Sequence, residues 1–156
     1  MDLKPRFETS NEMYMAGIRR HHLYFEAPTD IPEQWDEFTK FLPLDAQIGA
    51  ETYGIMCGDQ PEFQQFEYMV AVEVRDEAQY PELNSLIVPV ARYAVFTIKG
   101  DIENLRTAWQ YIYQEWLPQS GYDDNEEAPA FEKYGKDFDE TTNTGTFEIW
   151  IPIDKK

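Results

Sequence analysis

Two segments of the chain share residues at a constant spacing, and this repetition most restricts how the chain can fold. Five identical pairs lie 81 positions apart: Glu51 and Glu132, Tyr53 and Tyr134, Gly54 and Gly135, Phe66 and Phe147, and Glu67 and Glu148. We interpret the spacing as a sign of two related halves, over about residues 1–80 and 81–156 of a single domain. A chain of 156 residues is long enough for one domain with a sizeable core.

The hydrophobic pattern predicts the same order of elements in each half: strand, helix, strand, strand. In the first half, strands are expected at 13–18, 51–56 and 66–74. Between the first two, apolar residues recur at helical spacing and predict a helix that Pro43 ends; they are Trp35, Phe38, Phe41 and Leu42. The only basic cluster, residues 19–22, is expected to be a solvated strand end.

The second half repeats this order after a polar connector. Strands are expected at 86–90, 92–98, 130–135 and 146–153, with a longer helix over 105–117. We therefore predict an α+β fold, in which duplicated strand–helix–strand–strand units form one mainly antiparallel sheet with two helices on one face. A groove between the helices is the expected place for a binding site.

Composition excludes several classes of function. The net charge of −17 repels nucleic acid phosphates, so no direct contact with DNA or RNA is expected. Cys57 is the only cysteine, which excludes an intrachain disulfide and a thiolate metal cluster. Phosphate-binding loops and zinc spacings are absent, so neither a cofactor nor a metal is expected. The start lacks the apolar core of a signal peptide, and no apolar run reaches the roughly 20 residues needed to span a bilayer. We expect a cytoplasmic protein without membrane contact.

The repeated Glu-x-Tyr strands suggest a chemistry for the groove. Residues two apart share a face of a strand, so Glu132 lies with Tyr134, and Glu51 with Tyr53. If the halves pair about a pseudo-two-fold axis, both carboxylates and both phenols can converge on one cavity. A carboxylate among aromatic rings favours an arriving positive charge, and each ring adds about 0.5–2 kcal/mol of cation–π attraction. The pattern therefore predicts a site for a small lipophilic organic cation, with Glu132 as the charge anchor.

Three other interpretations remain open at this stage. Glu and Tyr on a strand are commonly surface residues. Two carboxylates and a phenol in an apolar cleft can also serve a small hydrolase as base, nucleophile and acid. The acidic surface can instead meet a basic protein partner, and a strand edge can pair two copies of the chain. No catalytic triad supports an enzyme, because His21 and His22 adjoin each other and Cys57 has no obvious base.

The chain resembles the GyrI-like, or AraC-type, effector-binding domain family, and more narrowly its integron cassette-encoded members. The resemblance is carried by ordered segments of the second half, at 92–96, 116–122, 129–134 and 148–153, and more loosely by 16–18, 35–38, 53–55 and 66–68. It implies a duplicated fold that binds effectors, without the helix-turn-helix domain of the regulators.

The resemblance also implies roles for single residues. Glu132 corresponds to the buried Glu that pairs with the charge of cationic drugs, and Tyr53 to a Tyr that lines the pocket. Trp109 and Tyr93 correspond by position to its wall. The proposed role of Glu51 comes only from the internal repeat.

Overall fold

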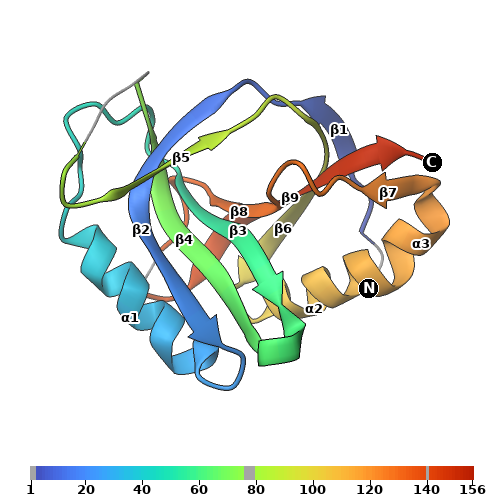
Figure 1. The fold of residues 1–156 in the computed structure, drawn as a ribbon, viewed down its shortest axis with the longest axis horizontal. Coiled ribbons are helices and arrows are strands. Elements are labelled where there is room, and N and C mark those ends of the chain that lie inside the picture. Colours follow the sequence, from blue (N-terminus) through green and yellow to red (C-terminus); the bar gives the residue numbers. More distant parts are fainter. Residues whose placement is uncertain (1–2, 76–79, 140) are drawn as a thin grey trace. The chain divides into compact units, whose positions relative to one another are not determined.

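A computed structural model describes residues 3–75, 80–139 and 141–156. The chain divides into two compact units. Unit I combines Met1–Asn11 with Pro89–Lys156, and unit II is the segment Glu12–Val88 between them. Figure 1 shows each unit with its own strands and its own helical segment.

Unit II is an antiparallel sheet with one helix. The strands lie in the order β3 (Thr52–Gln60), β4 (Gln65–Val74), β2 (Met13–Leu23) and β5 (Asn84–Val88). Helix α1 (Ala27–Thr39) packs on β2 and β4, and the one-turn helix η1 (Pro61–Phe63) joins β3 to β4. The core of the unit lies between α1 and the sheet, where Phe38 is fully buried against residues such as Ala16, Val70 and Val72.

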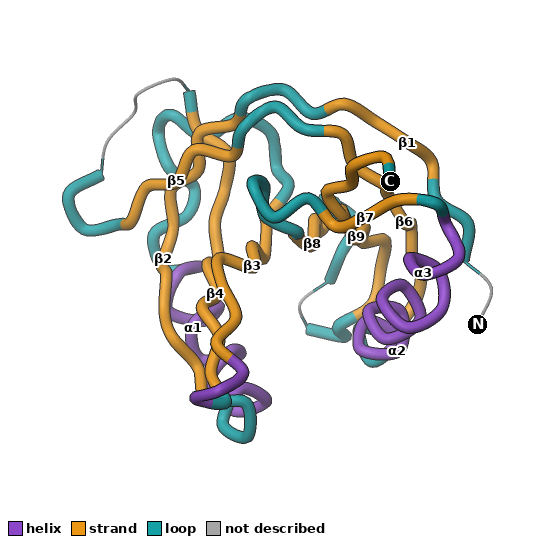
Figure 2. Tube along the Cα trace, turned by 45° about the vertical axis from the view of Figure 1, so that its right-hand side comes forward, coloured by secondary structure: helices purple, strands orange, loops and turns teal. Residues whose placement is uncertain are grey.

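Unit I repeats this layering with more strands. Its sheet runs in the order β1 (Arg6–Thr9), β6 (Arg92–Asp101), β9 (Thr144–Lys155) and β8 (Phe131–Tyr134), and β7 (Tyr122–Asp124) pairs with β9. Its helical segment comprises α2 (Asn104–Tyr111), the π-helical turn η2 (Ile112–Trp116) and α3 (Leu117–Ser120). Figure 2 shows α2 and α3 as successive parts of one coiled path.

The predicted α+β class and the repeated order of elements are confirmed. Unit II contains β2, α1, β3 and β4 in sequence, and unit I contains β6, α2, β8 and β9. All the pairings described within the units are antiparallel. The predicted end of the first helix was wrong, because α1 ends at Thr39. Phe41 and Leu42 lie beyond it, yet both still pack against the core.

A single offset of 81 residues does not relate the two units. Tyr53 lies opposite Ala71, so the offset would place Tyr134 opposite Pro152. Tyr134 instead lies opposite Phe147, and Pro152 pairs with Tyr93. The five identities are therefore not all equivalent positions, although the order of elements is shared. The physical reason is that β8 is four residues long and a longer connection leads from it to β9, whereas the nine-residue β3 turns directly into η1.

A buried amide fastens α1 to the sheet of unit II. Gln34 is fully buried, and its Nε2 donates to the carbonyl oxygens of Ile18, at 2.7 Å, and Tyr68, at 3.0 Å. Its Oε1 lies 2.6 Å from His22 Nε2. Because both amide hydrogens are committed to main-chain carbonyls, Oε1 is the acceptor and His22 Nε2 donates. The prediction of a solvated strand end at residues 19–22 was therefore wrong for His22, which is buried.

Replacing Gln34 by Leu should remove this link. The substitution leaves two buried carbonyl oxygens and the imidazole N–H without their partner, so we expect a loss of about 2–4 kcal/mol in the free energy of unfolding. Urea denaturation measures it. Gln60→Leu is the matched control, because the side-chain hydrogen bond that Gln60 accepts from Gln65 is exposed. Its loss should change the free energy of unfolding by no more than about 0.5 kcal/mol. Equal losses in both variants would contradict the role of Gln34.

Candidate ligand-binding site

The candidate site of unit I centres on Glu132, a charged residue that is only 4% exposed. Glu132 lies in β8 opposite Ile149 of β9, so it shares the face of the sheet that Phe147 and Tyr134 occupy. Phe131 and Lys133 lie on the other face, as the alternation of the strand predicts, and Lys133 Nζ sits over the ring of Trp150. Strand β8 thus places one carboxylate on the side of the sheet where the helical segment packs.

Two aromatic side chains hydrogen-bond to the carboxylate. Trp109 Nε1 donates to Glu132 Oε2 at 3.0 Å, and the Tyr134 hydroxyl donates to Oε1 at 2.9 Å. Both donors are neutral, so they stabilise the negative charge without cancelling it. Removing a carboxylate from water costs free energy that such bonds reduce and that an approaching cation reduces further. The arrangement is therefore suited to a ligand with a positive charge.

Tyr113 extends this cluster, and sequence reasoning did not assign it to the site. Its ring stacks on that of Trp109 with centroids 5.9 Å apart and planes 6° apart. Tyr113 is partly exposed, so the stack leads from the buried carboxylate towards the surface. In the sequence it appears as one more residue of the apolar helical stripe. The signal that distinguishes it is its position four residues after Trp109 on the same helix.

Burial also changes acidity around Tyr113. Burial, with a smaller contribution from the charge of Asp124, raises the pKa of the Tyr113 phenol. Burial raises the pKa of Asp124 as well, and the neighbouring charge of Glu126 adds to the increase. A phenol is protonated at neutral pH even at its ordinary pKa, so Tyr113 presents both a ring and a hydrogen-bond donor.

Tyr93, which was expected in the wall of the site, lies in unit I as well. Tyr93 packs on the face of the sheet opposite Glu132, with its ring 5.4 Å from Phe131 and 5.5 Å from Trp150. Its hydroxyl donates to the carbonyl of Pro129 at 2.8 Å. Unit I therefore brings together Glu132, Tyr134 and Trp109, and it keeps Tyr93 behind them.

Glu51 and Tyr53 belong to unit II. Tyr53 is buried in β3. Glu51 precedes that strand, is partly exposed and accepts a hydrogen bond from the main-chain nitrogen of Ala50 at 3.1 Å. Convergence of these two residues on Glu132 stays a prediction.

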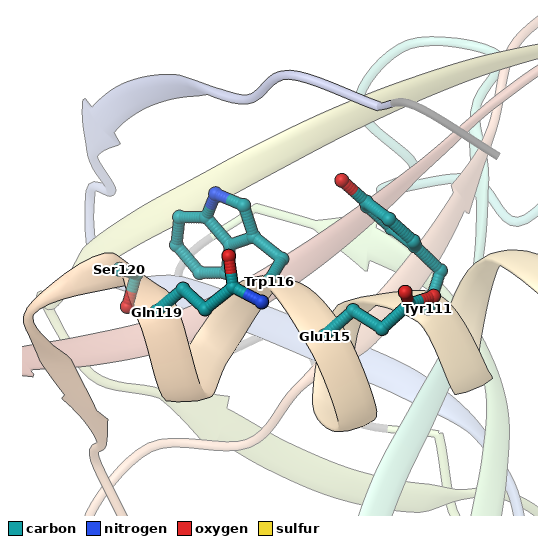
Figure 3. Close-up of a pocket in the computed structure, with 5 residues that line it drawn as sticks. All are labelled: Tyr111, Glu115, Trp116, Gln119 and Ser120. Atoms are coloured by element: carbon teal, nitrogen blue, oxygen red, sulfur yellow. The ribbon is translucent and has the colours of Figure 1, made fainter.

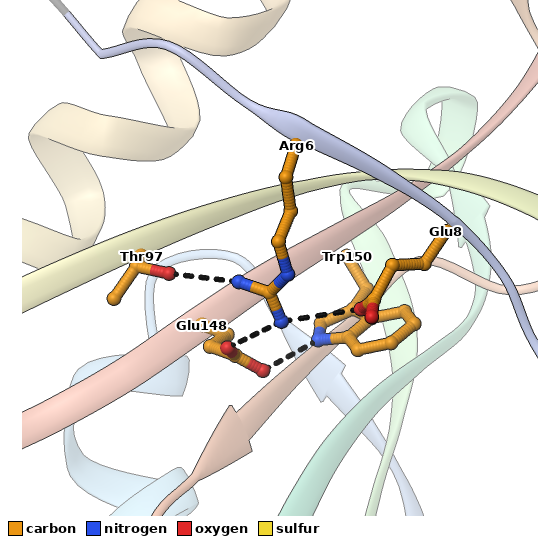
Figure 4. A network of polar contacts seen from close by, with 5 residues as sticks. All are labelled: Arg6, Glu8, Thr97, Glu148 and Trp150. Carbon is orange, nitrogen blue, oxygen red and sulfur yellow. Dashed lines mark hydrogen bonds and ion pairs between the residues drawn. The ribbon is translucent and has the colours of Figure 1, made fainter.

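Unit I holds a second carboxylate that accepts a hydrogen bond from an indole, and this carboxylate is also paired with an arginine. Glu148 Oε1 accepts from Trp150 Nε1 at 3.0 Å, while its Oε2 accepts from Arg6 Nη2 at 2.8 Å (Figure 4). Arg6 also reaches Glu8 and Thr97, both at 3.1 Å. Glu148 lies opposite Lys133 in the sheet, hence on the face away from Glu132. A guanidinium of the chain itself therefore balances the charge of Glu148.

A surface pocket of about 320 Å³ lies on the helical segment of unit I. Figure 3 shows its lining side chains, which are Tyr111, Glu115, Trp116, Gln119 and Ser120. It shares no residue with the Glu132 cluster, so it is a separate feature.

The described part of the chain contains no group of three or more His, Cys, Asp or Glu side chains placed to hold a metal ion. Within the same residues, none of the helices has the length and apolar character that crossing a bilayer requires.

Comparison with known proteins assigns the family. The model of the GyrI-like small molecule binding domain matches residues 3–154. The chain belongs to this family. Transcriptional regulator BrlR of Pseudomonas aeruginosa is 31% identical in an alignment of 139 residues that covers 83% of this chain and 49% of the regulator. This GyrI-like chain thus spans about half the length of the regulator, and the resemblance seen in the sequence is confirmed.

Solved structures with the same fold include a protein with a bound ligand and an integron cassette protein. SAV2435 bound to tetraphenylphosphonium matches with a TM-score of 0.71 and 18% identity, over 99% of this chain and 94% of that one. An integron cassette protein from the mobile metagenome of Vibrio cholerae matches with a TM-score of 0.66 and 13% identity, over 97% of both chains. At these identities the structures show the shared GyrI-like fold.

The hydrogen bond from Tyr134 to Glu132 can be tested by Tyr134→Phe, which keeps the ring and removes only the hydroxyl. A hydrogen bond to a buried charged group contributes about 1.5–3 kcal/mol, and we expect a loss of that size in the free energy of unfolding, measured in urea. Tyr93→Phe is the matched control, because its hydroxyl donates to a neutral carbonyl, that of Pro129, and such a bond contributes about 0.5–1.5 kcal/mol. A larger loss for Tyr93→Phe would contradict the role of the buried charge.

Proposed function

We propose that this GyrI-like domain binds lipophilic organic cations, and that Glu132 anchors their charge. The observation that carries the proposal is a buried carboxylate whose oxygens accept hydrogen bonds from two neutral aromatic side chains, Trp109 and Tyr134. The two donors hold the carboxylate in one orientation, which lowers the entropic cost of binding. Membership of a family of small molecule binding domains and a structural neighbour bound to tetraphenylphosphonium support the proposal.

The chemistry of the cluster favours bulky apolar cations over small hydrated ones. The stacked rings of Trp109 and Tyr113 offer aromatic surface beside the carboxylate. Each face attracts a cation by about 0.5–2 kcal/mol, more when water is excluded. An inorganic ion or an alkylammonium group loses strong hydration on entering such a site, whereas a cation whose charge is shielded by rings loses little. Burial of apolar surface and attraction between opposite charges then both contribute to the affinity for such a cation.

The proposal does not depend on the other predicted site residues, which are Tyr53, Glu51 and Tyr93. Ligand contact by Tyr53 and a charge contribution from Glu51 stay predictions. Tyr93 packs behind β8, so its proposed contribution is to hold Phe131 and the strand that carries Glu132. A cytoplasmic location belongs to the proposal, because the membrane potential draws permeant cations to the negative inner side of a cell membrane.

Isothermal titration calorimetry with two probes tests the charge anchor. Tetraphenylphosphonium is the cation, and triphenylphosphine oxide is an aromatic neutral compound. Glu132→Gln should weaken binding of the cation by about tenfold or more, as expected for the loss of a buried ionic contact, and change binding of the neutral probe by less than about twofold. Circular dichroism checks that the variant is folded.

Glu148→Gln is the matched control, because Glu148 is also bonded to an indole but is paired with Arg6. It should bind tetraphenylphosphonium as the wild type does. The proposal fails if Glu132→Gln leaves the affinity for the cation unchanged, or if the affinities for both probes fall to the same extent.

A further inference from the structure

Unit II ends in two neighbouring turns that expose three aromatic side chains. Tyr24 and Phe25 follow β2 and are 40% and 74% exposed, and Phe63 in η1 is 64% exposed. The main-chain nitrogen of Tyr24 donates to the carbonyl of Gln64 at 2.8 Å, which ties the two turns together. Both views of the fold show the turn after β2 beside η1 (Figures 1 and 2). We call Tyr24, Phe25 and Phe63 the aromatic tip.

The aromatic tip is held by the interior of unit II. The ring of Tyr24 lies 6.0 Å from that of Phe66, which lies 5.6 Å from the buried imidazole of His22. His22 in turn is bonded to Gln34 of α1. The hydroxyl of Tyr24 donates to Asp59 of β3, which joins the tip to a third element. Because these contacts order Tyr24 and the turn that carries it before anything binds, docking there costs less conformational entropy.

The charged residues of the two turns themselves are acidic, and the nearest arginines along β2, Arg19 and Arg20, are paired with Glu67 and Glu37. Residues 24–34 and 57–66, which form the two turns and their flanks, contain Glu26, Asp30, Glu33, Asp59 and Glu62, and no Lys or Arg. Exposed aromatic residues are enriched where proteins bind one another, and they supply much of the binding free energy there. An aromatic surface with acidic flanks is complementary to a surface that is apolar and basic.

We propose that the aromatic tip is a docking surface for a basic amphipathic segment of another polypeptide. A second copy of this chain would bring the same carboxylates together, so repulsion opposes self-association through the tip. Anionic membranes and nucleic acid are disfavoured for the same reason. A helix with one apolar and one Lys- or Arg-rich face satisfies both the aromatic side chains and their acidic flanks. This surface lies in unit II and does not include the Glu132 cluster.

The probe for this surface is a labelled peptide of Leu and Lys that forms an amphipathic helix, followed by fluorescence anisotropy. A peptide of the same composition in scrambled order reports attraction by net charge alone. The double variant Phe25→Ser/Phe63→Ser should bind the amphipathic peptide about tenfold more weakly or worse, as the loss of aromatic anchors predicts. Ile87→Ser is the control, because Ile87 of β5 is also exposed, at 56%, and belongs to the same unit.

A charge variant and an independent readout complete the test. Glu26→Gln/Glu62→Gln should lower affinity for the amphipathic peptide and flatten its dependence on salt. Tetraphenylphosphonium titration should be unchanged in the Phe25→Ser/Phe63→Ser variant, which separates this surface from the ligand site. The proposal is overturned if this variant binds the peptide like the wild type, or if the scrambled peptide binds equally well. It is also overturned if the tip mediates self-association or binding to phosphatidylglycerol vesicles.

Discussion

Withdrawal of one carboxylate from water is the constraint on which the rest of the site depends. Glu132 lies on the helix-facing side of β8, and burial there is costly unless each oxygen finds a donor. Tyr134 supplies one donor from the same strand, because residues two apart share a face. The other donor comes from Trp109, and it requires the helix to pack at a defined distance from the sheet. Buried residues of that helix, Ala108 and Ile112, therefore contribute to the site by fixing this distance.

Each face of the unit I sheet carries a glutamate that accepts a hydrogen bond from a tryptophan indole, and the two glutamates differ in their other partners. On one face, Glu148 and Trp150 are joined to Arg6, so a cation from the chain itself balances the carboxylate. On the other face, the donors that reach Glu132 from Trp109 and Tyr134 are neutral. One small unit thus holds two carboxylate–indole pairs, and a guanidinium of the chain itself reaches the pair formed by Glu148 and Trp150.

Local patterns predicted the order of elements and part of the site, whereas contacts between distant segments did not follow from them. Alternation along 130–135 placed Glu132 with Tyr134 correctly, because strand periodicity is a local property. The bond from Trp109 depends on the rotation of a helix that includes a π-helical turn, which spacing alone does not reveal. Burial of His22 depends on Gln34, which approaches from another element. The offset of 81 failed as a register because the lengths of strands and turns differ between the units, and β1 and β7 are too short to leave a clear pattern.

The position of a bound cation tests the central claim most directly. A crystal structure of the protein with tetraphenylphosphonium would locate the phosphorus atom relative to the Glu132 carboxylate. The account predicts a cation whose rings lie against Trp109 and Tyr113, with the Glu132 carboxylate as the nearest negative charge. A cation bound away from Glu132, for example in the pocket around Trp116 and Gln119, would contradict it.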